Sequence, residues 1–245
     1  MVDSATRVLR GMLTIWSKLY QVITIMNYVI ENQTVAYLDH YFFQKPQEMP
    51  EADASTFRAI APWFARDCRH VYFLYRVIPG ADPDSFVYLG GYNCQWAKDK
   101  AVAYYFWPTK AAKQWKILES QSLDAFQILH DCRFSEYAQD NENVFYLGKK
   151  LRGADANSFA IMYAEQIEEG TTAPSYHFGK DKTTIYFDGK PLMDVSLARF
   201  RVIRTTLEYG TDGVTAFYYD SARTKMVTIS YHALPLSVQA HFGLA

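Results

Sequence analysis

This 245-residue sequence contains few cysteines and has no excess of basic charge. Only Cys68, Cys94 and Cys132 occur, and they form no Cys-x-x-Cys pair, so a zinc site is not indicated. Free thiols in a reducing compartment are the simpler interpretation. The 25 basic and 26 acidic residues give a net charge of −1. Without a basic field to hold a phosphate backbone, general nucleic-acid binding is not expected.

An uncharged hydrophobic run of membrane-spanning length is also absent. Residues 8–30 are apolar overall, but Arg10 and Lys18 interrupt them, and a span needs about 18 or more uncharged residues. No small-residue cleavage pattern follows, so a signal peptide is not indicated either. Apolar side chains recur at helical spacing through this segment. We therefore expect residues 1–26 to form an amphipathic helix packed on the rest, in a cytoplasmic protein without a membrane span.

Local signatures of catalysis and metal binding are missing. The sequence has no Gly-rich phosphate loop, no Gly-x-Ser-x-Gly elbow and no dinucleotide-binding fingerprint. We predict no catalytic residues, no metal and no cofactor, and expect that the protein is not an enzyme, although a triad built from distant segments stays open. None of the six histidines stands in a metal-ligand spacing: His40, His70, His130, His177, His232 and His241.

Aromatic residues, by contrast, are abundant. Nineteen Tyr and sixteen Phe stand against twelve Gly and nine Pro, and aromatic side chains suit the half-buried surface of a β-sheet. In a recurring pattern, an acidic or amide turn precedes a β-branched and aromatic run. Turn signals such as Asp188-Gly189 predict that these runs form β-hairpins. The pattern has five clear copies and a weaker first copy, with turns at Asp67, Asp99, Asp140, Asp181, Asp212 and Glu31.

A second pattern is linked to the first. Asp or Ser stands four residues before a Phe, and another apolar residue stands three places after that Phe. The side-chain oxygen at the first position suits a helix N-cap, and Pro83 suits the first helical position. The Phe and the later apolar residue share one face and can pack on a neighbouring strand. The five copies occupy residues 53–57, 82–86, 122–126, 155–159 and 196–200.

Together the patterns predict a mainly β (α+β) fold. Five to six stacked β-hairpin repeats, each followed by a short capped helical turn, are expected in residues 27–227. Such a unit is too small to bury its own apolar face, so stacked neighbours must cover it. Residues 1–26 would add the amphipathic helix, and residues 228–245 a final strand and tail.

The repeated residues resemble the bacterial DKNYY family. The likeness is carried by residues 137–146 with 153–159, and by residues 177–187, which follow that family's pattern of Asp-Lys-x-x-Val-Tyr and Gly-Ala-Asp-x-x-Ser-Phe. It covers roughly residues 27–219. Members of the family resemble accessory and immunity proteins of bacterial competition loci more than metabolic enzymes, which is an association and not a mechanism.

The recurring aspartates are the most tempting candidates for chemistry. They could be read as paired carboxylates for acid–base catalysis or as calcium ligands. A catalytic pair would occur once, however, and a calcium loop gathers several oxygen ligands within about a dozen residues. We therefore assign Asp99, Asp140 and Asp181 to turns, and Asp53, Asp82 and Asp155 to caps.

Two insertions break the repeat, at residues 107–115 and 165–174. Insertions in repeat proteins form loops, often on the binding face, and Trp is enriched in binding hot spots. Two simpler interpretations stay open: the tryptophans could cover a sheet edge, and the acidic loop could be a solvated face. The predicted partner-binding residues are Trp107, Lys110, Lys113, Trp115, Glu165, Glu168 and Glu169.

Three functions are consistent with these features. The leading hypothesis is a non-enzymatic immunity protein that binds a cognate bacterial antagonistic toxin, of the type VI secretion, Rhs or contact-dependent kind, and neutralises it by occlusion. The alternative is a surface- or envelope-associated repeat protein that binds glycan or another protein. A third is an enzyme that reverses a toxin's modification.

Overall fold

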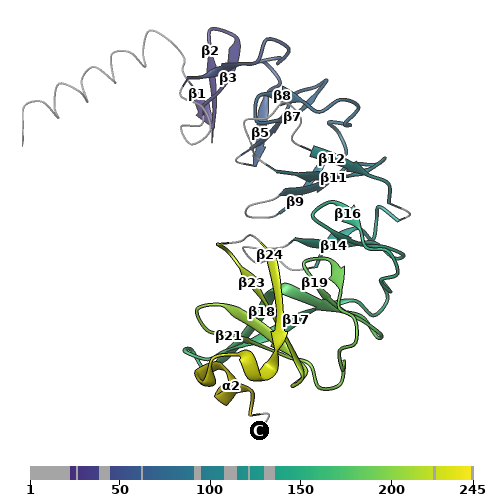
Figure 1. The fold of residues 1–245 in the computed structure, drawn as a ribbon. Helices are drawn as coiled ribbons and strands as arrows, with labels where there is room; N and C mark the ends of the chain where they lie inside the picture. The colour runs from purple at the N-terminus through teal and green to yellow at the C-terminus, as the bar shows by residue number, and fades with distance from the viewer. Residues whose placement is uncertain are drawn as a thin grey trace, which may run out of the picture. The chain divides into compact units, whose positions relative to one another are not determined.

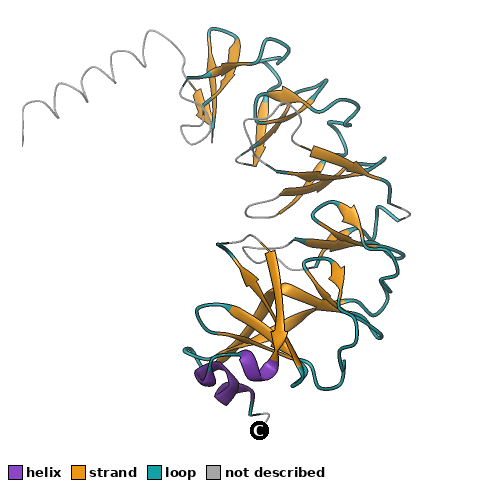
Figure 2. Ribbon diagram, in the orientation of Figure 1, coloured by secondary structure: helices purple, strands orange, loops and turns teal. Residues whose placement is uncertain are grey.

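The computed structural model describes residues 23–25, 27–38, 45–61, 63–90, 95–107, 115–120, 122–129, 136–222 and 225–243. Within these ranges the protein is mainly β, as predicted, with 24 strands and helical structure confined to the C-terminal end (Figure 2). The predicted helix in residues 1–26 lies almost entirely outside the described residues. In that segment only Ile23–Ile25 are described, and they form strand β1.

The strands group into six sets of four, here called repeats 1 to 6 (Figure 1). Within each set, strands that are consecutive in sequence lie side by side. Repeat 1 contains β1 (Ile23–Ile25), β2 (Tyr28–Glu31), β3 (Thr34–Tyr37) and β4 (Gln47–Glu48), and repeat 2 contains β5 (Arg58–Ala61), β6 (Phe64–Arg66), β7 (Val71–Phe73) and β8 (Arg76–Val77). Repeat 3 contains β9 (Val87–Gly90), β10 (Gln95–Lys98), β11 (Ala103–Phe106) and β12 (Trp115–Leu118).

The remaining three repeats follow the same plan. Repeat 4 contains β13 (Gln127–Ile128), β14 (Tyr137–Gln139), β15 (Val144–Tyr146) and β16 (Lys149–Lys150). Repeat 5 contains β17 (Ala160–Gln166), β18 (Thr171–Lys180), β19 (Ile185–Phe187) and β20 (Lys190–Pro191). Repeat 6 contains β21 (Arg201–Arg204), β22 (Glu208–Thr211), β23 (Thr215–Asp220) and β24 (Lys225–Ser230). The unit of the fold is thus a four-stranded sheet and not the two-stranded hairpin predicted from the sequence.

A buried aspartate holds each of repeats 2 to 6 together from the connection between the second and third strands. In repeat 5, Asp181 Oδ1 accepts the backbone N–H groups of Thr183 and Thr184, both at 2.8 Å. Its Oδ2 accepts the backbone N–H of Asp155 at 3.0 Å and the hydroxyl of Tyr186 at 2.9 Å. One carboxylate therefore joins the connecting turn, the third strand and the segment that enters the first strand. We call this arrangement the clasp.

The clasp recurs with small variations. Its carboxylates are between 2% and 4% exposed in all five repeats: Asp67, Asp99, Asp140, Asp181 and Asp212. Oδ2 of four of them accepts a backbone N–H from the Phe-containing turn, namely from Asp53, Asp82, Asp155 and Ser196. In repeat 4 the hydroxyl of Ser120 takes that place. The Phe-containing turn therefore opens a repeat, whereas the sequence pattern suggested that it follows one.

Each Phe-containing segment forms a single turn and not the predicted helical turn. Asp82 Oδ1 accepts the N–H groups of Asp84 and Ser85 at 3.1 and 2.9 Å, and the amine of Lys100 lowers the pKa of this carboxyl to about 2. Asp53 and Asp155 accept corresponding N–H groups. The polar residue caps a turn as an N-cap would, but the first strand begins directly after the Phe, so too few residues are left to propagate a helix.

The Phe of each turn connects its own repeat to the preceding one. The Phe159 ring lies 5.4 Å from Tyr137 in repeat 4 and 5.6 Å from Tyr186 in repeat 5, measured between ring centroids. Offset aromatic contacts at such distances add to the area that they bury. Equivalent contacts join Phe57 to Tyr28 and Tyr72, Phe86 to Phe64, Phe126 to Trp96 and Phe145, and Phe200 to Phe178 and Phe217.

Space for the Phe ring comes from a small residue two places before each clasp aspartate. A Cβ on Gly179 would lie 2.6 Å from the Phe159 ring, and one on Gly210 would lie 2.7 Å from the Phe200 ring. An aromatic residue precedes the small one in every copy, so the motif is aromatic-small-x-Asp. Our sequence analysis missed it, although aligning the five aspartates would have exposed it. The small residues are Ala65, Ala97, Ala138, Gly179 and Gly210.

Repeats 5 and 6 share one eight-stranded sheet, because β17 pairs in parallel with β21. Ala164, Glu165 and Gln166 lie opposite Val202, Ile203 and Arg204. The insertion at residues 165–174 extends the β17–β18 hairpin and thereby provides the additional residues for this pairing. It lies inside repeat 5.

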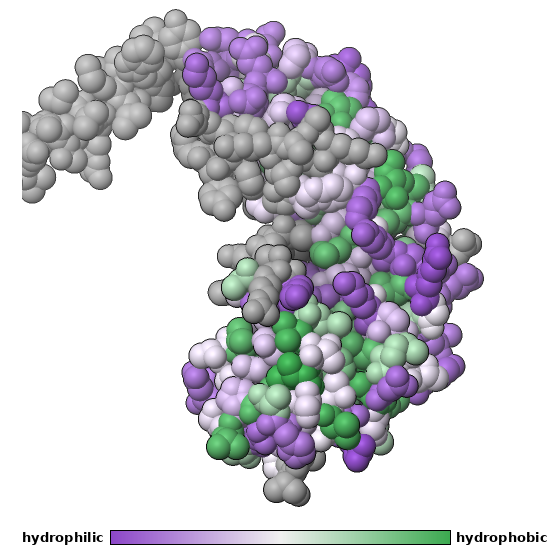
Figure 3. Space-filling view, in the orientation of Figure 1, coloured by the Kyte–Doolittle hydropathy of each residue, from purple (hydrophilic) through white to green (hydrophobic). Residues whose placement is uncertain are grey.

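The C-terminal segment packs on repeat 6. The 3-10 helix Tyr231–Ala233 is followed by helix α2 (Leu236–Phe242), which the predicted strand and tail did not include. Val238 and Phe242 of α2 are buried together with Ile203 and Tyr209. On the face shown in Figure 3, hydrophobic and hydrophilic residues are interspersed over the C-terminal repeats.

The chain divides into two compact units, and the division runs through repeat 3. The first contains the described residues up to Tyr88 together with Lys98–Lys100. The second contains those of Leu89–Ala97 and Ala101–Pro108, and all from Trp115 onward.

Replacing a clasp carboxylate should destabilise the protein. Asp181→Asn leaves backbone N–H donors without a full set of acceptors, so we expect a loss of about 2 kcal/mol in the free energy of unfolding, measured by urea denaturation. Tyr186→Phe removes one donor, as Phe145 and Phe217 do naturally in repeats 4 and 6, and should cost about 1 kcal/mol. Asp194→Asn at an exposed left-handed position is the control. Equal effects of Asp181→Asn and Asp194→Asn would contradict the clasp.

The clasp should also make the protein sensitive to acid. Burial raises the pKa of Asp67, Asp140, Asp181 and Asp212, but hydrogen bonds to each carboxylate outweigh it and leave the pKa below the ordinary 3.8. A lowered folded-state pKa contributes stability above the unfolded pKa, and that contribution is lost as pH falls through the folded value. We expect the urea midpoint to fall as the pH drops below 3.8, and to fall less steeply in Asp181→Asn.

Candidate functional site

An open groove of about 470 Å³ lies at the turns of repeats 3, 4 and 5. The turns Leu147-Gly148 and Asp188-Gly189 join the third and fourth strands of repeats 4 and 5. Repeat 3 contributes two residues to the lining of this part of the groove: Tyr105 of its third strand and Trp107, which directly follows that strand. The full lining is Tyr105, Trp107, Lys116, Tyr146, Leu147, Lys149, Lys150, Leu151, Asp188, Gly189 and Lys190.

Glycine at each turn brings the backbone onto the aromatic ring of the preceding repeat. Gly148 and Gly189 have φ angles of +64° and +70°, a region that side chains with a Cβ adopt rarely. A Cβ on Gly148 would lie 2.7 Å from Tyr105, and one on Gly189 would lie 2.6 Å from Tyr146. The positive φ angle and the short distance to the ring both require glycine at these two positions. The turns therefore pack closely on the rings and form a close-packed base beneath the groove.

Lysines supply most of the charge of the groove. Lys149 and Lys150 form β16, and Lys190 begins β20, all with exposed side chains. In the described part of the chain, no carboxylate lies within ion-pair distance of these three amines. Lys116 differs, because its amine donates to the carbonyl of Leu147 at 2.9 Å. The same amine lies 5.5 and 5.4 Å from the ring centroids of Tyr105 and Trp107.

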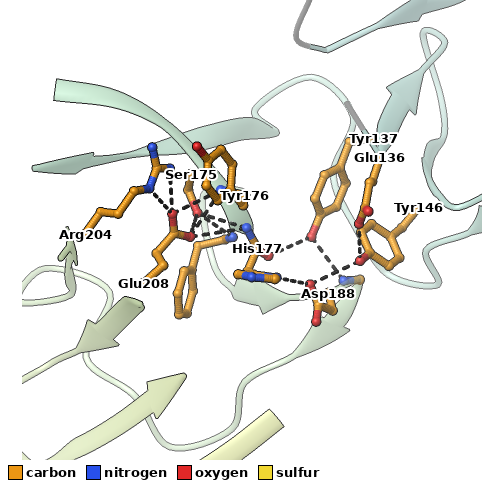
Figure 4. A network of polar contacts seen from close by, with 11 residues as sticks. Glu136, Tyr137, Tyr146, Ser175, Tyr176, His177, Asp188, Arg204 and Glu208 are labelled. Carbon is orange, nitrogen blue, oxygen red and sulfur yellow. Dashed lines mark hydrogen bonds and ion pairs between the residues drawn. The ribbon is translucent and has the colours of Figure 1, made fainter. Parts of the chain in front are cut away.

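A polar network underlies one end of the groove and is shown in Figure 4. Asp188 Oδ1 lies 2.7 Å from Nδ1 of His177 and accepts the Tyr146 hydroxyl at 3.1 Å. The His177 ring is stacked on Phe187 and on Tyr219, at 5.2 and 5.3 Å between centroids. Burial lowers the pKa of His177, but Asp188 outweighs it, so the pKa is raised above 6.5. The stacked rings hold His177 in place, and His177 in turn holds Asp188, which lines the groove.

Glu136 shares the Tyr146 hydroxyl with Asp188. Glu136 Oε2 lies 2.5 Å from that hydroxyl. Burial raises the pKa of Glu136, and the neighbouring Asp188 raises it further. The Tyr146 hydroxyl has one proton and lies within hydrogen-bonding distance of both carboxyl groups, so it can donate to only one of them at a time.

Glu208 occupies the other end of the network. Its carboxylate, 5% exposed as a residue, pairs with Arg204 at 2.7 Å and accepts the Ser175 hydroxyl at 2.5 Å. The Arg204 guanidinium carbon lies 3.6 Å from the centroid of the Tyr176 ring. Ser175 Oγ also accepts the N–H of Phe178 at 2.7 Å, so structural partners occupy this hydroxyl. The arrangement fixes β18 to β22.

The predicted partner-binding residues do not form one site. Trp107 lines the groove, whereas Trp115 is 9% exposed and packs near Phe106. Lys110 and Lys113 lie outside the described residues. None of the three glutamates lines the groove: Glu165 pairs with Arg201 at 2.8 Å, Glu169 accepts from Gln166, and Glu168 is exposed.

Most groove residues were not predicted from the sequence. Lys149, Lys150 and Lys190 lie directly after turn glycines, within the repeat pattern and not at its breaks. The sequence feature that could have indicated these lysines is a basic residue after a hairpin turn. His177 and Asp188 are eleven residues apart and become neighbours only through β-pairing, so no local spacing indicated them.

The described residues contain no cluster of three or more His, Cys, Asp or Glu side chains that could hold a metal ion. Of the cysteines, Cys68 is free and exposed, while Cys94 and Cys132 lie outside the described residues. None of the described helices has the length and apolar character needed to cross a membrane.

Fold and site together define a β-repeat protein with an open groove of lysine and aromatic residues. Residues 28–173 match the model of the DKNYY family. The chain therefore belongs to the DKNYY family, which confirms the resemblance seen in its repeats. No curated protein matches the chain.

The close contact of Gly189 gives a test of the groove's base. Gly189→Ala places a Cβ 2.6 Å from Tyr146 at a φ of +70°, and we expect a loss of about 2 to 3 kcal/mol in unfolding free energy. Gly153→Ala is the matched control, because Gly153 has a φ of +81° but no atom within 4 Å of the added Cβ. It should cost about 1 kcal/mol from strain alone. Equal losses in urea denaturation would show that the contact is not tight.

The His177–Asp188 pair predicts a loss of stability on the alkaline side. Its folded pKa is raised above 6.5, so its contribution is complete below the unfolded pKa and is lost as pH rises through the folded pKa. We expect the urea midpoint to fall across that window in the natural protein. Asp188→Asn should flatten this dependence while leaving the acid limb in place. An unchanged alkaline slope in Asp188→Asn would show that the pair does not control it.

Proposed function

We propose that this protein is a cytoplasmic, non-enzymatic immunity protein. It binds a cognate bacterial antagonistic toxin, delivered by a type VI secretion, Rhs or contact-dependent route, and neutralises it by occlusion. The observation that carries the proposal is the groove, where exposed lysines without carboxylate partners stand beside aromatic rings on a close-packed base. Membership of the DKNYY family supports it, because members of that family resemble immunity proteins more than metabolic enzymes.

The use of the polar groups supports binding over catalysis. The clasp aspartates accept backbone N–H groups, and Glu208 is paired with Arg204. Ser175 is held by Glu208 and by backbone donors. A catalytic nucleophile or base needs spare hydrogen-bonding capacity directed at a substrate. The exposed amines of Lys149, Lys150 and Lys190 line the groove instead, and they suit recognition.

Occlusion requires a surface of adequate size and rigidity. A standard protein interface buries about 800 Å² on each partner, and three neighbouring repeats around the groove can provide such an area. The lining residues come from short paired strands and tight turns, so little conformational entropy is lost on binding.

Co-expression with the product of the adjacent gene tests this function. We expect that product to be toxic alone, to lose its toxicity with this chain, and to co-elute with it in size-exclusion chromatography. Protection should saturate at equimolar chain, because occlusion is stoichiometric. The proposal fails if the neighbour is not toxic, if no complex forms, or if far less than an equimolar amount protects, since that would indicate an enzyme.

The aromatic side of the groove favours one second candidate, an envelope-associated repeat protein that binds glycan. The partly exposed rings of Trp107 and Tyr146 line the groove, and such rings can stack on sugars. Fractionation of the native protein to the periplasm, together with binding to neutral cell-wall oligosaccharides, would favour this candidate over the immunity protein.

A further inference from the structure

We propose that the groove receives an acidic segment of the toxin, in which carboxylates flank one apolar or aromatic side chain. This inference rests on the proposed function and adds the chemistry of the contact. The carboxylates would meet Lys149, Lys150 and Lys190. The apolar side chain would lie on the partly exposed ring of Trp107 and the stem of Lys116.

Charge complementarity selects the acidic partner. Four lysines line the groove against a single carboxylate, that of Asp188. Two exposed lysines elsewhere are compensated: Lys100 pairs with Asp82, and Lys182 pairs with Asp155. The groove amines therefore form a local positive field on a chain whose net charge is −1, which steers and orients an acidic partner.

The repeat architecture places this charge where the turns converge. Arg76 in repeat 2 and Lys190 in repeat 5 occupy the same position as Lys149, directly after the turn between the third and fourth strands. In repeat 2 the guanidinium donates to the hydroxyl of Tyr75 at 2.8 Å and lies 5.0 Å from its ring. Repeats 4 and 5 have glycine in place of Tyr75. The amines of Lys149 and Lys190 therefore have no such ring beside them and remain available to a partner.

The network beneath the groove keeps Asp188 from cancelling this field. Asp188 Oδ1 is engaged by His177 and by the Tyr146 hydroxyl, and in the described residues no lysine pairs with this carboxylate. A raised His177 pKa adds positive charge beside Asp188 when the ring is protonated. The lysines then act on a bound ligand without an internal competitor.

The apolar half of the groove explains why the segment needs more than charge. Trp107 packs against Tyr105, and the Lys116 amine lies above both rings while it donates to the Leu147 carbonyl. The Tyr105 ring is only 4% exposed and packs against Trp107, whose partly exposed ring lies next to the lysines. An aromatic or apolar side chain between two carboxylates would cover it and contribute binding energy beyond electrostatics.

The experiment compares two triple variants of the full chain against the toxin encoded by the adjacent gene. The first removes the groove amines, as Lys149→Gln, Lys150→Gln and Lys190→Gln. The second removes three exposed lysines elsewhere, as Lys45→Gln, Lys180→Gln and Lys225→Gln. Both change the net charge equally, and urea denaturation verifies that both fold. Calorimetric titration should give at least about tenfold weaker binding for the groove variant, with a flatter salt dependence, and less than about threefold for the control.

A probe independent of the toxin separates this inference from the proposed function. A fluorescein-labelled peptide of alternating Glu and Tyr should bind the natural chain and lose affinity in the groove variant, whereas its Gln–Tyr counterpart should not bind. If the toxin binds the natural chain and the groove variant equally, the inference is wrong and the proposed function stands. If the toxin never binds but the Glu–Tyr peptide does, the proposed function is wrong and the groove's chemistry stands. Preference for a sulfated oligosaccharide over the peptide would overturn the acidic segment.

Discussion

The buried carboxylate of the clasp is the interaction on which each repeat from 2 to 6 depends. Most strands of these repeats have two to four residues and provide few hydrogen bonds, and a four-stranded sheet of this size cannot bury its own apolar face. Asp181 accepts donors from its turn, from Tyr186 and from the segment that enters the first strand. These bonds offset the cost of burying the charge and fix the Phe-containing turn. The position of Phe159 between Tyr137 and Tyr186 follows from that constraint.

The clasp also decides which polar groups are left for a partner. Because the recurring aspartates satisfy backbone N–H groups, the residues that resemble catalytic carboxylates in the sequence are occupied in the structure. The network of His177, Asp188 and Tyr146 occupies further acidic groups and holds them below the groove. Exposed lysines and partly exposed rings then provide the charge and the apolar surface of the site. This distribution is the physical basis for proposing recognition and not catalysis.

Much of the fold could be predicted from the sequence, and less of the site. The aspartate-led runs predicted the repeats, the β character and the family, because turn chemistry and aromatic strands are local properties. The same local view gave a hairpin where the structure has four strands, since β16 and β20 are only two residues long and carry little pattern. It also predicted a short helical turn in each Phe-containing segment, where the first strand begins too early for a helix to form. Of the predicted binding residues, Trp107 lies in the groove, and Trp115 is buried.

The sequence alone determined the repeat, its turn and cap residues and the absence of local catalytic signatures, because each of these depends on residues that are near one another in the chain. Tertiary structure decided that the Phe-containing turn opens its repeat, that β17 pairs with β21, and that Lys149, Lys150 and Lys190 meet Trp107 at one groove. It also brought His177 to Asp188. These features depend on strand pairing and on the packing of one repeat against the next. A single sequence does not specify which distant segments such contacts bring together.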